Sequence, residues 1–113
     1  MISTMPLFCL DDKGKNCWID GLDILYIDLY KRKKLRFHLL NGVYVFQFDG
    51  SLETCVRMFS PFGFEELDSK NLVNINKIKY IDDKLRIAYF DNNLHTTISF
   101  RNMYKVEHLP KKE

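Results

Sequence analysis

The stretch LRFHLLNGVYVFQF, residues 35–48, decides the fold. Before Asn41-Gly42, apolar residues alternate with polar ones, and after it Tyr44, Phe46 and Phe48 alternate with their neighbours. Two runs of period two around Asn-Gly are the strongest short-range signal for a β-hairpin, because these two residues accept the positive φ angles of a two-residue turn. The sequence therefore predicts two antiparallel strands joined at residues 41–42.

Further short strands are expected on both sides of this hairpin, because β-branched and aromatic residues gather between turn-forming Asp, Asn and Gly. The expected strands are residues 7–10, 23–27, 78–81, 85–89 and 94–100, with turns at residues 12–15, 82–84 and 91–93. Two sets of side chains are expected to face inward: the stripe Leu85, Ile87 and Tyr89, and the aromatics Tyr26, Tyr44, Phe46 and Phe48. No alternation of strand and helix is visible, which favours antiparallel sheets.

One helix is predicted after Ser51, which can cap it, with Leu52, Val56 and Phe59 on one face. Pro61 and Gly63 are expected to end this helix. A short C-terminal helix is expected around residues 101–108, with its apolar side chains facing inward: Met103, Val106 and Leu109. The fold class is therefore mainly β, with one or two short helices.

Length and composition favour one domain over residues 1–109 and a flexible tail over residues 110–113. The chain has 113 residues, of which 46% are hydrophobic, enough for one core. No signal peptide and no membrane span are visible, so the cytoplasm is the expected location. The three cysteines lack a CxxC spacing and favour free thiols, with Cys55 packed in the core.

Catalysis is not expected. The three histidines (His38, His95, His108) are scattered, with no order of acid, histidine and nucleophile. Asp82 and Asp83 read as turn residues and not as an acid–base pair. The sequence therefore predicts no enzyme, no cofactor, no metal and no small-molecule substrate.

Charge is unevenly distributed along the chain. Residues 1–30 hold five Asp against two Lys, a net charge of −3, whereas the remainder holds fifteen bases against ten acids, a net charge of +5. Five of the six residues from Lys31 to Arg36 are basic. Such a run is typical of a hairpin edge whose lysines prevent pairing with other chains, or of a loop that contacts phosphates. The residues alone favour the two interpretations about equally.

Three stretches, taken together, resemble the LytTR family, the DNA-binding domains of many bacterial two-component regulators. The first stretch is DILYID, residues 23–28, followed by the basic loop and the Asn-Gly hairpin. The second comprises the helix, PFGF at residues 61–64 and LVNINKI at residues 72–78, and the third is TISFRN, residues 97–102. Their order and spacing hold from about Asp23 to Val106.

The resemblance implies an elongated stack of small antiparallel sheets with ten strands, whose loops enter successive major grooves of a bent duplex. It implies a transcription regulator that binds paired direct repeats, with a homodimer or another LytTR protein as a further partner. The implied DNA-binding residues lie in three segments: Lys31, Arg32, Lys33 and Lys34; Ser69, Lys70 and Asn71; and Arg101 and Asn102. Lys33 and Arg101 are the expected base-reading residues, and Lys77 and Lys79 are expected to support Lys70 at the phosphates.

The sequence departs from the family pattern at two positions. Glu66 and Asp68 stand where the family usually has Arg and His. We expect Asp68 to cap a short helix, although an Asp can also accept a hydrogen bond from a cytosine amino group. Glu66 has no such alternative and is expected either to point sideways to a nearby lysine or to mark weakened binding. The alternative hypothesis is a LytTR-derived protein-binding module, an antagonist of a regulator, with weakened or lost DNA binding.

Overall fold

The computed structural model describes residues 4–112, which form two antiparallel sheets. The larger sheet has seven strands in the order β2-β1-β5-β4-β3-β7-β6, and the smaller has three in the order β10-β9-β8. The strands are β1 (Pro6–Leu10), β2 (Asn16–Asp20), β3 (Tyr26–Tyr30), β4 (Lys34–Leu39), β5 (Gly42–Phe46), β6 (Phe64–Asp68), β7 (Asn71–Asn74), β8 (Tyr80–Asp82), β9 (Ile87–Tyr89) and β10 (His95–Thr97). The principal extents are 40 × 30 × 27 Å.

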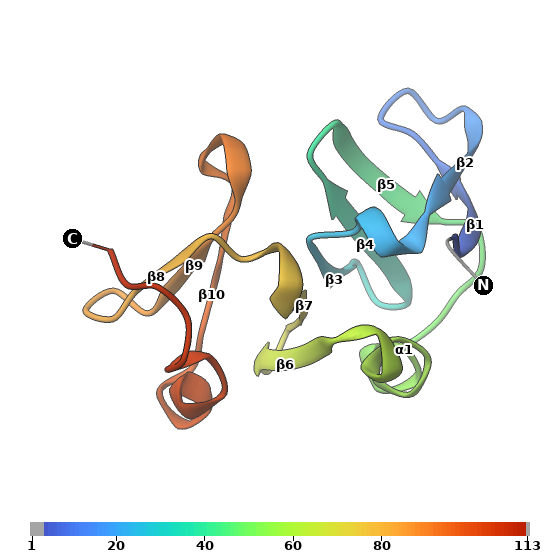
Figure 1. The fold of residues 1–113 in the computed structure, drawn as a ribbon. Coiled ribbons are helices and arrows are strands. Elements are labelled where there is room, and N and C mark those ends of the chain that lie inside the picture. Colours follow the sequence, from blue (N-terminus) through green and yellow to red (C-terminus); the bar gives the residue numbers. More distant parts are fainter. Residues whose placement is uncertain (1–3, 113) are drawn as a thin grey trace.

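Helices connect and flank the two sheets. The α-helix is α1 (Leu52–Phe59), and the 3₁₀ helices are η1 (Gly21–Asp23), η2 (Ser60–Phe62), η3 (Ile75–Lys77), η4 (Asp91–Asn93) and η5 (Phe100–Val106). Figure 1 shows the small sheet on one side, the large sheet on the other, and α1 and the red C-terminal helix along the lower edge. No helix within residues 4–112 is long and apolar enough to cross a membrane.

The central hairpin is confirmed as an antiparallel strand pair, but its two-residue turn is at residues 40–41 and not at residues 41–42, because Gly42 is already the first residue of β5. β4 pairs with β5 from Arg36 opposite Val45 to Leu39 opposite Gly42. Leu35, Phe37 and Leu39 are buried, and the residues between them are only partly buried. The aromatic stripe of the second strand ends earlier than expected, because β5 stops at Phe46 and the chain bends away; Phe48 is 64% exposed, so its prediction as a core residue was wrong.

The predicted helix is confirmed at both ends. The Ser51 hydroxyl accepts a hydrogen bond from the Thr54 amide at 3.2 Å, which satisfies a free N–H of the first turn. After the 3₁₀ turn that contains Pro61, Gly63 adopts a φ of 90°, a conformation that glycine accepts without strain. Phe59 and Cys55 are buried against the large sheet.

The small sheet differs from the prediction in register. The turn between β8 and β9 includes Leu85 and Arg86, and Leu85 is 64% exposed. Ala88 and Phe90 are buried in place of the expected stripe. Because side chains alternate along a strand, a shift of one residue exchanges the buried and exposed faces.

Other segments also differ from the prediction. The strand expected at residues 23–27 is β3 at Tyr26–Tyr30, and the strand expected at residues 94–100 is the shorter β10 at His95–Thr97. β2 was not predicted; it forms the edge of the large sheet, and the turn at residues 12–15 joins it to β1. Residues 110–112, expected as a flexible tail, lie beside β8: the Ile81 amide donates to the Pro110 carbonyl at 2.8 Å, and the Lys112 amide to the Ile81 carbonyl at 2.7 Å. The tail thus lies alongside the small sheet.

The structure has two apolar cores. The first lies between the large sheet and α1 and includes Phe37, Phe59 and Phe64. The second lies between the small sheet, η5 and the β6–β7 hairpin, and Leu67 and Val73 are fully buried in it. β6 and β7 contribute to both cores, so the position of their shared turn is fixed from two sides.

Candidate nucleic-acid interface

The basic turn is formed by residues 31–33, between β3 and β4. Tyr30 lies opposite Lys34 at the end of the strand pair, and Lys31 has a φ of 61°. The carbonyl of Lys33 accepts a hydrogen bond from the Gly50 amide at 2.9 Å, which ties the turn to the segment before α1. Lys34 forms an ion pair with Asp49 at 2.8 Å, so its charge is partly compensated inside the protein.

The second turn, at residues 69–70, joins β6 to β7. Asp68 holds this turn: one of its carboxylate oxygens accepts from the Ser69 amide at 2.7 Å, and the other accepts from the Thr97 hydroxyl at 2.6 Å. The expectation that Asp68 caps a helix was wrong, because the residue ends a strand. Lys70 is exposed at the tip of the turn.

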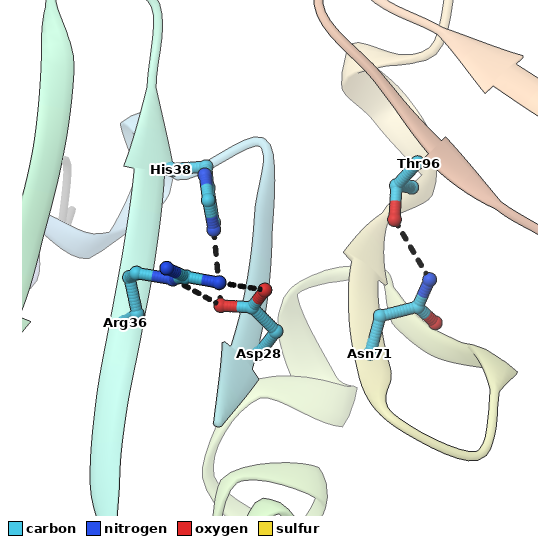
Figure 2. Close-up of polar contacts among 5 residues, drawn as sticks. All are labelled: Asp28, Arg36, His38, Asn71 and Thr96. Atoms are coloured by element: carbon cyan, nitrogen blue, oxygen red, sulfur yellow. Dashed lines mark hydrogen bonds and ion pairs between the residues drawn. The ribbon is translucent and has the colours of Figure 1, made fainter. Parts of the chain in front are cut away.

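Asn71 lies inside the protein and not on its surface. Its side chain is only 4% exposed, which is incompatible with the expected contact to DNA. Its amide nitrogen donates to the Thr96 hydroxyl and to the Thr97 carbonyl, both at 2.9 Å, and its amide oxygen accepts from the Asp68 amide at 2.8 Å. Figure 2 shows Asn71 directed from β7 toward Thr96, which lies on β10 of the small sheet. Asn71 therefore supports the turn from behind.

Arg101 and Asn102 stand in the first turn of η5. Arg101 is exposed, and Asn102 is partly buried, with its side-chain amide donating to the Ser99 hydroxyl at 2.9 Å. Two bonds attach this segment to β6: the Ser99 amide donates to the Leu67 carbonyl at 2.7 Å, and Lys105 Nζ to the Glu66 carbonyl at 2.8 Å. The expected inward packing of the C-terminal helix is confirmed: Val106 is buried, and Met103 and Leu109 pack against the same core.

Strand pairing brings these segments together. β3 and β7 are antiparallel, with Asp28 opposite Asn71. β3 runs into the basic turn, whereas β7 begins directly after residues 69–70. Because paired antiparallel strands run in opposite directions, the two turns lie at the same end of the large sheet. Because η5 is bonded to β6, Arg101 lies near the second turn.

A hollow of about 540 Å³ lies where η5 meets the second turn. It is lined by Glu66, Asp68, Ser69, Ser99, Arg101, Asn102 and Lys105. Lys105 was not singled out from the sequence, because no local pattern relates it to β6. Glu66, expected either to point sideways to a lysine or to mark weakened binding, lines this hollow, and Lys105 binds its backbone carbonyl and not its carboxylate.

Behind the basic turn, a cluster on β3 and β4 is held by ion pairs. Asp28 accepts two hydrogen bonds from the Arg36 guanidinium, at 2.9 and 2.8 Å, and lies 3.0 Å from His38 Nε2 (Figure 2). Burial alone would raise the pKa of Asp28, but the contacts to Arg36 and His38 outweigh it and lower that pKa. The Arg36 guanidinium is therefore bound within the sheet. In contrast, Lys31, Arg32 and Lys33 of the basic turn are exposed.

Two of the three cysteines are buried. Burial raises the pKa of Cys9 to about 12 and that of Cys55 to about 11, so neither thiol ionises readily. The expectation that Cys55 is a packed thiol is confirmed, since its side chain is 2% exposed. Within residues 4–112, no group of three or more His, Cys, Asp or Glu side chains is arranged to hold a metal ion.

Comparisons with known proteins agree with this architecture. The sequence matches the family model described as the LytTr DNA-binding domain over residues 15–110. Among solved structures, a LytTr DNA-binding domain from Bacillus cereus has a similar fold, with a TM-score of 0.73 and 15% sequence identity over 92% of this chain and 95% of that chain. A search of the curated proteins found no match. Since the family model spans most of the chain, the protein belongs to the LytTR family of DNA-binding domains.

Proposed function

We propose that this domain binds duplex DNA at specific sequences and regulates transcription in the cytoplasm, its turns entering successive major grooves. The observation that carries the proposal is the convergence of the basic turn, the turn at residues 69–70 and the start of η5 at one end of the large sheet. The proposed contacts come from Lys31, Arg32, Lys33, Ser69, Lys70, Arg101 and Asn102. Lys34 and Asn71 are assigned supporting roles, because both have partners within the protein.

The chemistry divides between phosphates and bases. Lysine and arginine side chains on the turns neutralise phosphates, which supplies affinity without sequence preference. The guanidinium of Arg101 can donate two parallel hydrogen bonds to O6 and N7 of a guanine, a contact that distinguishes guanine from the other bases. Lys33 is the second proposed base-reading residue, and two copies of the domain are proposed to occupy paired direct repeats.

Substitution of Arg101 tests this proposal. An operator is first selected from a library of randomised duplexes, and affinities are then measured by fluorescence anisotropy on the operator and on a random duplex. Arg101→Ala is expected to weaken operator binding about tenfold or more, with little change on the random duplex. Arg86→Ala, in the turn between β8 and β9, is the matched control. Equal losses on both duplexes would contradict a base-reading role for Arg101.

One observation favours a second candidate function, the binding of another protein. Glu66 and Asp68 line the same hollow as Arg101, so the most recessed part of the proposed interface carries both signs of charge. A protein surface with mixed charges would complement such a hollow better than a polyanion does. Titration of a random duplex at low salt separates the two: failure to bind at micromolar concentrations would favour the protein-binding module.

A further inference from the structure

β6, two of whose residues line the hollow with Arg101, contains a bulge between Glu65 and Asp68. Glu65 lies opposite Val73 and Asp68 lies opposite Asn71, so β6 spans one residue more than β7 over the same length. Leu67 is fully buried in the second core, whereas Glu66 is exposed. Bulges next to functional sites commonly redirect a side chain. Here the bulge lets Leu67 pack inward while Glu66 lines the hollow.

The backbone of Glu66 is fixed by Lys105. Lys105 Nζ lies 2.8 Å from the Glu66 carbonyl oxygen and 4.0 Å from a carboxylate oxygen of Glu65. Within residues 4–112, the Glu66 carboxylate has no ion pair and no hydrogen bond. Lys105 thus holds the backbone of the bulge but does not neutralise the Glu66 carboxylate.

The two acids of the hollow differ in what they can still bind. Both carboxylate oxygens of Asp68 accept hydrogen bonds from within the protein, from the Ser69 amide and the Thr97 hydroxyl. Asp68 therefore holds the turn. The oxygens of Glu66 are available to an external donor, and an ionised carboxylate can only accept hydrogen bonds.

We propose that Glu66 reads a cytosine, by accepting a hydrogen bond from its exocyclic N4 amino group in the major groove, close to the guanine read by Arg101. Cytosine offers a donor at this edge, whereas guanine offers only acceptors. Adenine places the N7 acceptor beside its amino group, which would repel a carboxylate. Arg101 and Glu66 in one hollow thus offer donors and an acceptor that match the two bases of G·C pairs. The inference rests on the proposed function.

The same carboxylate should also reduce binding to other sequences. Where no amino group faces it, Glu66 lies among phosphates and is repelled by them. Its negative charge therefore lowers affinity for random DNA while it contributes one hydrogen bond at the cognate site. We expect the ratio of operator to random binding, more than the affinity itself, to depend on Glu66.

The test compares base preferences position by position. Operators are selected with the wild-type domain, Glu66→Ala, Glu66→Gln and the control Glu65→Gln, which makes the same change of charge at the neighbouring residue. Each base pair of the wild-type operator is then replaced, and affinities are measured by anisotropy. We expect wild type and Glu65→Gln to prefer cytosine about tenfold at one position. Glu66→Ala is expected to lose this preference, and Glu66→Gln to move it toward adenine, since an amide pairs with both N6 and N7.

The outcomes separate this inference from the proposed function. If wild type selects an operator but the two Glu66 variants keep every base preference, Glu66 does not read a base and the inference alone is overturned. If both Glu66 variants gained affinity equally on operator and random duplexes, Glu66 would act only by repelling phosphates. That result would likewise overturn the inference. If wild type selects no sequence at all, the proposed function fails and the inference falls with it.

Discussion

Individual side chains determine how firmly the second turn is held, and Asn71 makes three hydrogen bonds there. It bonds to the Asp68 amide, the Thr96 hydroxyl and the Thr97 carbonyl from a buried position. Asn71→Ala leaves these groups without partners, and each loss of a buried hydrogen bond costs about 1–3 kcal/mol. We expect the free energy of unfolding, measured in urea, to fall by about 2–4 kcal/mol. Asn102→Ala, with one partly buried bond, is the control; an equal loss there would contradict the supporting role of Asn71.

The ion pairs of Asp28 predict an acid-sensitive stability. The pKa of Asp28 in the folded protein is lower than its ordinary value of 3.8, so its ionised form is favoured by folding. This contribution is fully present above pH 3.8 and is lost as the pH falls through the lowered folded value. In urea titrations from pH 7 to pH 3, Asp28→Asn is expected to be less stable than wild type at neutral pH and to lose less stability in acid. Parallel curves for the two proteins would exclude this coupling.

At the scale of elements, the C-terminal segment supports the small sheet on which η5 packs. Two backbone hydrogen bonds join residues 110–112 to Ile81, and Lys111 Nζ donates to the carbonyls of Glu107 and Leu109, both at 2.9 Å. Truncation after Leu109 is expected to lower the free energy of unfolding by about 1–3 kcal/mol, because a net backbone hydrogen bond is worth about 0.5–1.5 kcal/mol. Lys112→Ala keeps the backbone bonds and serves as the control. Unchanged stability of the truncated domain would show that the segment does not support the sheet.

For the whole molecule, local patterns predicted the central hairpin and α1, because their signals lie within a few neighbouring residues. β2 was missed, since an edge strand that exposes Trp18 carries little apolar alternation. The role of Asn71 could not be predicted either, because its partners Thr96 and Thr97 are distant in sequence and resemble surface residues. The family resemblance indicated the segments of the candidate site, but only the fold shows which side chains are free.

The overall charge distribution predicts how binding responds to salt. Each phosphate that a lysine or arginine neutralises contributes a slope of about −0.9 to the plot of log affinity against log salt. Lys70 is exposed at the tip of the second turn, so Lys70→Ala is expected to make this slope about one unit shallower on operator and random duplexes alike. Lys84→Ala, in the turn between β8 and β9, removes the same charge and should leave the slope unchanged. If both variants shifted the slope equally, the net charge of the domain would attract the DNA. The converging turns would then not be the phosphate-binding surface.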